Sequence, residues 1–131
     1  LFERPQTTFV GYFIGSPAMN IYECSVSDRN QVSIEGNKFN VNTVIPNSKS
    51  KYLKLGIRSE YITVEKSRSE NTIEADVIEV EDFGNYKLIT SAIGSIKIKA
   101  KAKRELDVPS EKVLLKFPRQ HCCIYENNIL I

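Results

Sequence analysis

Residues 96–103 alternate strictly between apolar and basic side chains, in the order Ile, Lys, Ile, Lys, Ala, Lys, Ala, Lys. Successive side chains of a β-strand point to opposite faces of the sheet. A strand with this pattern buries one face and presents a row of lysines on the other. The segment therefore predicts a sheet that is covered on one side only.

After Asn20, the rest of the chain also consists of short extended stretches separated by turn residues. Gly36-Asn37 predicts a two-residue hairpin turn, and Phe83-Gly84-Asn85 and Gly94-Ser95 predict two further turns. The expected strands cover residues 21–27, 32–35, 38–41, 52–58, 61–64, 73–82, 86–91, 96–103, 113–117 and 122–125. Many short antiparallel strands with regular turns predict a mainly β fold built as one or two OB-like barrels.

The first residues differ from this pattern. Phe9, Val10, Phe13 and Ile14 recur at helical spacing, and Gly15 and Pro17 follow them as stop signals. This predicts one short helix at about residues 6–14, within an N-terminal segment 1–20 that precedes a β-domain over 21–131. The polar, apolar-free segment 66–71 is the expected boundary between two halves, 21–65 and 72–131.

Composition narrows the class of protein. The chain has 131 residues, of which 26% are charged and 41% hydrophobic, as in an ordinary globular domain. Its formal charge of 18 − 16 = +2 does not favour nucleic acid or an anionic membrane as a partner. Three cysteines are too few for a disulfide framework. Because the first residue is Leu1 rather than Met, we expect a processed chain or a piece of a longer one.

Motifs for catalysis or cofactor binding are missing from the sequence. Neither GxxxxGK[ST], GxGxxG nor GxSxG occurs, so no phosphate loop or nucleophile elbow is predicted. His121 adjoins Cys122 and Cys123, but neighbouring residues of a strand face opposite ways, so we expect one thiol in the core and one at the surface. These residues also have poor spacing for zinc. We expect no catalytic residue, cofactor or metal in this chain.

The lysine row admits two interpretations. Small barrels bind single-stranded nucleic acid through basic residues interleaved with aromatic ones. Here the interleaved residues are Ile and Ala, which cannot stack on bases. A solvated face that discourages edge-to-edge pairing is the simpler interpretation.

Residues 5–20 resemble a segment of a known family. The pattern P-x-x-x-F-V-x-x-F-I-G-S-P-x-M-N joins the nucleotide-binding domain to the C-terminal domain in ATP-binding subunits of sugar-type ABC importers, such as the maltose-importer ATPase. Ten positions of the segment match, namely Pro5, Phe9, Val10, Phe13, Ile14, Gly15, Ser16, Pro17, Met19 and Asn20. Residues 55–60 resemble the family's L-G-I-R-P-E, with Ser59 in place of proline, and residues 80–85 resemble its V-E-x-L-G.

The resemblance implies a non-catalytic regulatory and dimerisation domain of the TOBE type, which follows an ATPase domain outside this chain. ATP and Mg would belong to that ATPase domain. The implied partners are a second copy of the subunit, the importer's membrane subunits through the ATPase domain and, in some members, a regulatory protein. The implied location is the cytoplasmic side of the cell membrane, and the implied cargo is a carbohydrate or related solute. The motif residues become interface candidates: Phe13, Gly15, Ser16, Pro17, Met19, Asn20, Arg58 and Glu60.

Two other functions stay open at this point. A ligand-sensing domain would bind a solute or oxyanion, with Lys97, Lys99 and Lys101 as natural anion contacts. A free-standing OB barrel would bind single-stranded nucleic acid, and its affinity would fall steeply with salt.

Overall fold

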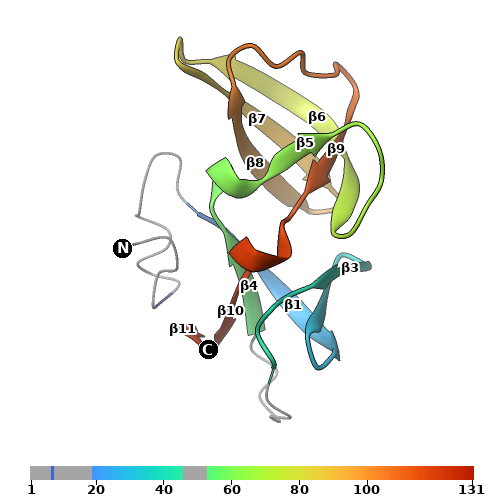
Figure 1. Cartoon of the computed structure of the whole chain (residues 1–131), viewed down its shortest axis with the longest axis vertical. Helices are drawn as coiled ribbons and strands as arrows, with labels where there is room; N and C mark the ends of the chain where they lie inside the picture. The colour runs from blue at the N-terminus through green and yellow to red at the C-terminus, as the bar shows by residue number, and fades with distance from the viewer. Residues whose placement is uncertain (1–6, 8–18, 46–52) are drawn as a thin grey trace.

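The computed structural model describes Thr7, residues 19–45 and residues 53–131, and these residues form a mainly β fold of two curled sheets (Figure 1). The mainly β class predicted from the alternating patterns is therefore confirmed, and the curled sheets are consistent with an OB-like fold. The helix predicted at 6–14 lies outside the described residues.

The first sheet lies in the lower half of Figure 1 and has six strands in the order β11-β10-β4-β1-β2-β3. All of its pairings are antiparallel. Its strands are β1 (Asn20–Asp28), β2 (Gln31–Ile34), β3 (Asn37–Asn40), β4 (Leu53–Ile57), β10 (Cys123–Glu126) and β11 (Ile129–Leu130).

The second sheet lies in the upper half of Figure 1 and has five antiparallel strands in the order β5-β9-β6-β7-β8. Its strands are β5 (Thr63–Glu65), β6 (Thr72–Asp82), β7 (Tyr86–Ile93), β8 (Ile96–Lys103) and β9 (Lys112–Lys116). The two sheets are interleaved along the chain, because β5 joins the second sheet and β10 returns to the first.

The chain crosses between the sheets at two short 3₁₀ helices, η1 (Ser59–Tyr61) and η2 (Arg119–His121). Both have the same hydrogen bonds: Tyr61 N–H donates to Arg58 O at 3.0 Å, and His121 N–H donates to Pro118 O at 3.0 Å. The last residues of the two helices stack, since the rings of Tyr61 and His121 lie 3.8 Å apart and 3° from parallel. The strand expected at 61–64 therefore begins two residues late, because Tyr61 closes a 3₁₀ turn.

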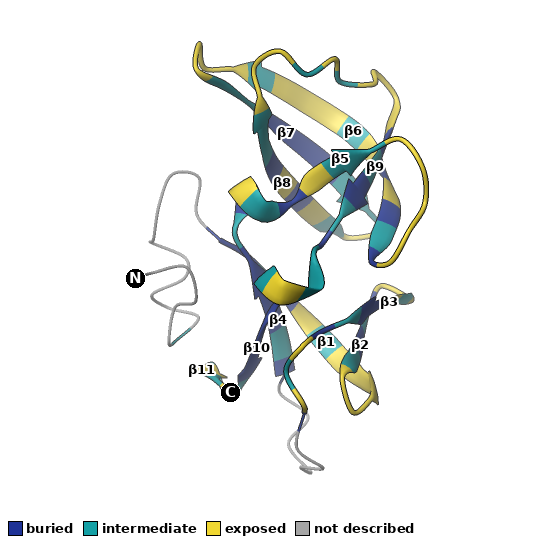
Figure 2. Cartoon of the chain, viewed as in Figure 1, coloured by how far each residue is buried: buried dark blue, intermediate teal, exposed yellow. Residues whose placement is uncertain are grey.

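Buried residues occur on the strands of both sheets, and Figure 2 colours them dark blue. The main core draws on both sheets, for example Val32, Leu55 and Ile57 from the first and Ile98 and Leu115 from the second. On β8, Ile98 and Ala100 are buried while the side chains of Lys97 and Lys99 are exposed, as the alternation predicts.

The two adjacent cysteines correct an expectation. Cys122 is buried in the main core, as predicted for one of the pair. Cys123, expected at the surface, is instead fully buried with Met19 and Tyr125 in a second cluster. The reason is that the first sheet is covered on both faces around β10.

The hairpin between β2 and β3 turns one residue earlier than predicted. Glu35 and Gly36 both have positive φ, of 51° and 80°, and Ile34 pairs with Asn37. A type I′ turn favours glycine at its second central position, so Glu35 becomes the first and Asn37 starts the strand. The turns predicted at 83–85 and 94–95 are confirmed, with positive φ at Gly84 and Gly94.

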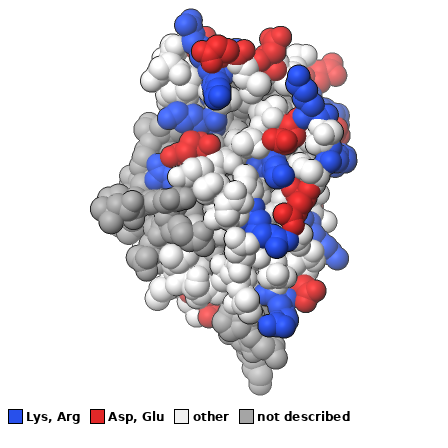
Figure 3. All heavy atoms as spheres, viewed as in Figure 1, with Lys and Arg blue, Asp and Glu red and all other residues white. Residues whose placement is uncertain are grey.

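Lysine, arginine and acidic side chains alternate over the face of the molecule shown in Figure 3 and form no continuous patch of one sign. This distribution agrees with the near-neutral charge of the sequence. Within the described residues, no helix has the length and hydropathy to cross a membrane.

Candidate functional site

The family-motif residues that the structure describes converge at the start of β1 and the end of β4. Met19 is 5% exposed and packs on Gly56, at the glycine of the L-G-I-R motif. A Cβ at Gly56 would lie 2.8 Å from Met19 Cε and 3.0 Å from Tyr125 Cε2. A methyl group at this position would have to displace the end of the Met19 side chain and the edge of the Tyr125 ring.

Asn20 binds the edge of β8 with its side chain. Its Nδ2 donates to Lys99 O at 2.8 Å, and its Oδ1 accepts from Lys99 N–H at 3.0 Å. The carboxamide thus forms the two hydrogen bonds that a neighbouring strand would otherwise form. Ser59, in the second family motif, lies 3.4 Å from the same Nδ2, so both motifs meet at this contact.

Tyr22 extends this contact along β8. Its hydroxyl oxygen lies 2.7 Å from Lys97 O and 3.0 Å from Asn20 Oδ1. Burial raises the pKa of the Tyr22 phenol well above its usual range, which keeps the hydroxyl protonated. Residues of β1 in the first sheet therefore cover the edge of β8 from Lys97 to Lys99.

A second asparagine makes the reciprocal contact. Asn71, just before β6, has Oδ1 2.8 Å from Asn40 N and Nδ2 2.7 Å from Asn40 O, at the end of edge strand β3. It is buried, has a φ of 60°, and also donates to Phe117 O at 2.9 Å. Each sheet thus sends one carboxamide to the edge strand of the other, a feature the sequence pattern did not reveal.

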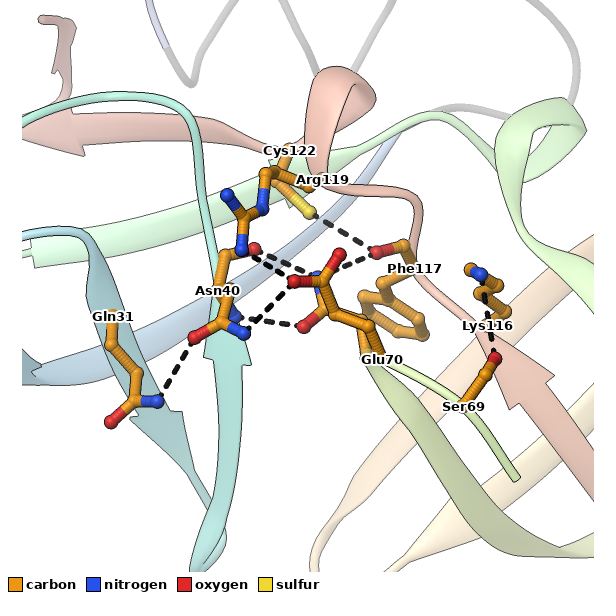
Figure 4. A network of polar contacts seen from close by, with 9 residues as sticks. Gln31, Asn40, Ser69, Glu70, Lys116, Phe117, Arg119 and Cys122 are labelled. Carbon is orange, nitrogen blue, oxygen red and sulfur yellow. Dashed lines mark hydrogen bonds and ion pairs between the residues drawn. The ribbon is translucent and has the colours of Figure 1, made fainter.

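Figure 4 shows the polar network around this second contact. Asn40 donates from Nδ2 to Glu70 Oε2 at 3.1 Å and accepts from Gln31 Nε2 at 2.9 Å. Glu70 also forms an ion pair with Arg119 of η2. The hydrogen bond from Asn40 and the neighbouring Arg119 guanidinium lower the pKa of the Glu70 carboxyl.

Arg58 and Glu60, two other interface candidates, flank the start of η1. Arg58 Nε donates to Glu60 Oε2 at 3.0 Å, and their side chains are 15% and 36% exposed. The pair therefore reaches the surface beside the buried Met19 and Asn20. The candidates Phe13, Gly15, Ser16 and Pro17 lie outside the described residues.

A cavity of about 500 Å³ opens beside this ion pair, at the seam between β5 and β8. Its apolar lining comes from Ile62, Val64, Ala102 and Leu106. Glu60 and Lys101, which belong to different sequence motifs, both line it. Of the three lysines predicted as anion contacts, Lys101 alone lines this cavity, and its Nζ lies 4.4 Å from the centre of the Tyr86 ring.

The described residues contain no group of three or more His, Cys, Asp or Glu that could hold a metal ion. Burial raises the pKa of the Cys24 thiol to about 12, so this cysteine is not a thiolate nucleophile at neutral pH. The seam cavity is lined by apolar and charged side chains, so it is suited to binding a ligand rather than to catalysis by a metal or thiolate.

Comparison with known proteins supports the family resemblance. The chain is 32% identical over 128 residues to the multiple sugar-binding transport ATP-binding protein MsmK of Streptococcus mutans, covering 89% of this chain and 34% of that protein. It is 36% identical over 93 residues to the xylose/arabinose import ATP-binding protein XacK of Haloferax volcanii, covering 67% of this chain and 24% of that protein. An sn-glycerol-3-phosphate import ATP-binding protein, UgpC of Vibrio vulnificus, is 31% identical over 93 residues, covering 71% of this chain and 24% of that protein.

A solved structure shares the fold. The cytoplasmic molybdate-binding protein ModG, crystallised with molybdate bound, superimposes with a TM-score of 0.62 and 11% sequence identity, over 80% of this chain and 94% of that one. No protein-family model matches the chain. The fold is thus that of a TOBE/OB-type domain. The chain is homologous to the C-terminal part of sugar-importer ATP-binding proteins, and it spans about a third or less of their length.

Proposed function

We propose that this chain is the regulatory and dimerisation domain of the ATP-binding subunit of an importer for carbohydrate or a related solute. The observation that carries the proposal is the convergence of Met19 and Asn20 with Gly56 and Ser59, which explains both family motifs by one packed contact. Similarity to sugar-importer subunits supports the same assignment. Residues 1–20 would link the β-domain to an ATPase domain, which would hold ATP and Mg.

The physical purpose of such a domain is to keep two subunits together when their ATPase domains separate. A second contact raises the effective concentration of one ATPase domain near the other. In this proposal the second subunit would contact the surface around the exposed Glu60, beside the motif contact. The domain would then lie on the cytoplasmic side of the membrane, attached to the membrane subunits through its ATPase domains.

Sedimentation of the complete ATP-binding subunit, with and without residues 19–131, tests this proposal. In the presence of ADP, we expect the complete subunit to remain a dimer and the truncated one to dissociate. A truncated subunit that stays dimeric in ADP, or ATP turnover by the 131-residue chain alone, contradicts the proposal.

A ligand-sensing role is the second candidate, favoured by the shared fold with molybdate-binding ModG and by the exposed side chains of Lys97 and Lys99. If this role holds, molybdate should raise the melting temperature of the chain, and the double variant K97A/K99A should abolish the shift. If none of molybdate, sulfate and phosphate shifts the melting temperature, the ligand-sensing role is contradicted. The near-neutral net charge and the missing aromatic interleaving leave the nucleic-acid role without support.

A further inference from the structure

The outer edge of β8 faces away from β7. Three of the four odd-numbered residues of this strand have backbone groups that are hydrogen-bonded at this edge. Asn20 binds the N–H and C=O of Lys99, the Tyr22 hydroxyl lies 2.7 Å from Lys97 O, and Leu106 N–H donates to Lys103 O at 3.1 Å. These contacts show that odd-numbered residues of β8 direct their backbone groups to this edge.

Lys101 is the exception. It pairs with Leu88 of β7, and hydrogen-bonded and non-bonded pairs alternate along an antiparallel ladder. Because Lys99 gives its backbone groups to Asn20, Lys101 also points its N–H and C=O away from β7. Among the described residues, none forms a hydrogen bond with these two groups.

The free backbone groups of Lys101 open onto the seam cavity. Three consecutive residues, Lys101, Ala102 and Lys103, line it, which means that the strand meets the cavity with its edge rather than with one face. Ala102 lies on the face of β8 that Ile98 and Ala100 bury in the core. The apolar wall across the cavity is formed by Ile62 and Val64, so a side chain entering here meets apolar surface from β5 and β8 together.

We propose that this edge and cavity bind an extended peptide segment of a partner protein, which pairs with Lys101 and places apolar side chains in the cavity. The Asn20 carboxamide already binds this edge at Lys99, two residues before Lys101, in the way that we expect a peptide group to bind at Lys101. A peptide residue opposite Lys101 would offer the same donor and acceptor as Asn20 does. Its two neighbours would point to the opposite face, toward Ala102 and Ile62.

The charges at the rim specify the peptide further. Lys101 and Lys103 bring two positive charges, while the carboxylate of Glu60 is paired with Arg58 and Glu105 is the remaining acid. The rim is therefore net positive. An acidic residue opposite Lys101, flanked by two apolar residues, complements both the rim and the cavity. The inference does not depend on the proposed subunit contact, because binding is measured with the 131-residue chain alone.

The probe is a fluorescein-labelled peptide of sequence Thr-Leu-Asp-Leu-Thr with blocked ends, and binding is followed by fluorescence anisotropy. Two variants separate backbone from side chain: Lys101→Ala removes the charge and keeps the N–H, whereas Lys101→Pro removes both. Proline is tolerated at an edge position whose N–H lies outside the ladder, and the melting temperature confirms that each variant is folded. We expect binding by Lys101→Pro to be about tenfold weaker than binding by Lys101→Ala.

A second comparison uses the unaltered protein. The same peptide with an N-methyl group on its aspartate cannot donate to Lys101 O, and we expect it to bind about tenfold more weakly. Equal binding of the two peptides, equal binding by the proline and alanine variants, or no binding by the unaltered protein overturns the proposal. Displacement of the peptide by molybdate alone also overturns it, since the site would then recognise an anion rather than a strand.

Discussion

Asn20 and Lys99, 79 positions apart in the sequence, are joined by two hydrogen bonds between one carboxamide and one backbone residue. The contact closes the edge of β8 with a side chain of β1, and so links the second sheet to the first. Asn71 repeats the arrangement in the opposite direction at Asn40. The relative position of the two sheets is therefore held by two buried amides as well as by the apolar core.

Replacing Asn20 by Ala should destabilise the fold by about 2 to 4 kcal/mol, because it leaves the N–H and C=O of Lys99 without partners. Asn20→Asp should cost a similar amount, since a carboxylate oxygen would then face Lys99 O. Urea unfolding measures both, with an unchanged m-value as the sign of a common fold. Asn42→Ala, at an exposed position, is the matched control and should change stability by less than about 0.5 kcal/mol.

Asn71 allows a test that separates backbone conformation from hydrogen bonding. Glycine suits its φ of 60° but lacks the amide, so Asn71→Gly should lose about 2 to 3 kcal/mol through the missing hydrogen bonds. Asn71→Ala should lose about 1 kcal/mol more, because it adds strain at positive φ. Thermal unfolding of the two variants compares them, and equal stability would show that the φ at this position carries no cost.

Gly56→Ala should destabilise the domain by about 1 to 3 kcal/mol, because the new methyl group meets Met19 and Tyr125. The loss should be smaller when Met19 is also replaced by Ala, since the nearest obstructing atom is then gone. A double-mutant cycle in urea gives the coupling energy. Additive effects of the two changes would contradict the packing of Met19 on Gly56.

Glu70 provides a pH test. Its pKa is lowered in the folded protein by Asn40 and Arg119, so the unfolded chain binds more protons in the acid range. The stabilising contribution is complete above the unfolded pKa of about 4.3 and is lost as the pH falls through the lower folded value. The stability difference between the unaltered protein and Glu70→Gln should therefore shrink from pH 6 to pH 3. A difference that stays constant over this range would exclude a role for the Glu70 carboxylate.

The alternation in 96–103 and the turn residues were enough to predict the mainly β class and most strands. Local sequence patterns were less informative where the backbone conformation or burial of a residue depends on contacts with distant segments. The turn at Glu35-Gly36, the 3₁₀ helix at Tyr61 and the burial of Cys123 depend on register and on packing against β4, η2 and Met19.

The candidate site shows the same division. The motif residues Met19, Asn20 and Glu60 were found by resemblance, but the contact of Asn20 with β8 was not. Asn20 meets Lys99, and Glu60 and Lys101 line one cavity, only because β8 lies beside the start of β1 and η1. Hydrogen bonds over 79 residues leave no periodic signal in the sequence. Asn20 does not stand out in the sequence either, because its strand also carries the polar residues Glu23, Ser25 and Ser27.

Amide hydrogen exchange at Lys99 and Lys101 of the unliganded chain tests the central claim most directly, because it compares two positions of one edge in one experiment. Asn20 covers Lys99, while the edge at Lys101 is open. We expect the Lys101 amide to exchange at least about tenfold faster than the Lys99 amide. Equal protection of the two amides would contradict both the bond from Asn20 and the free edge at the cavity.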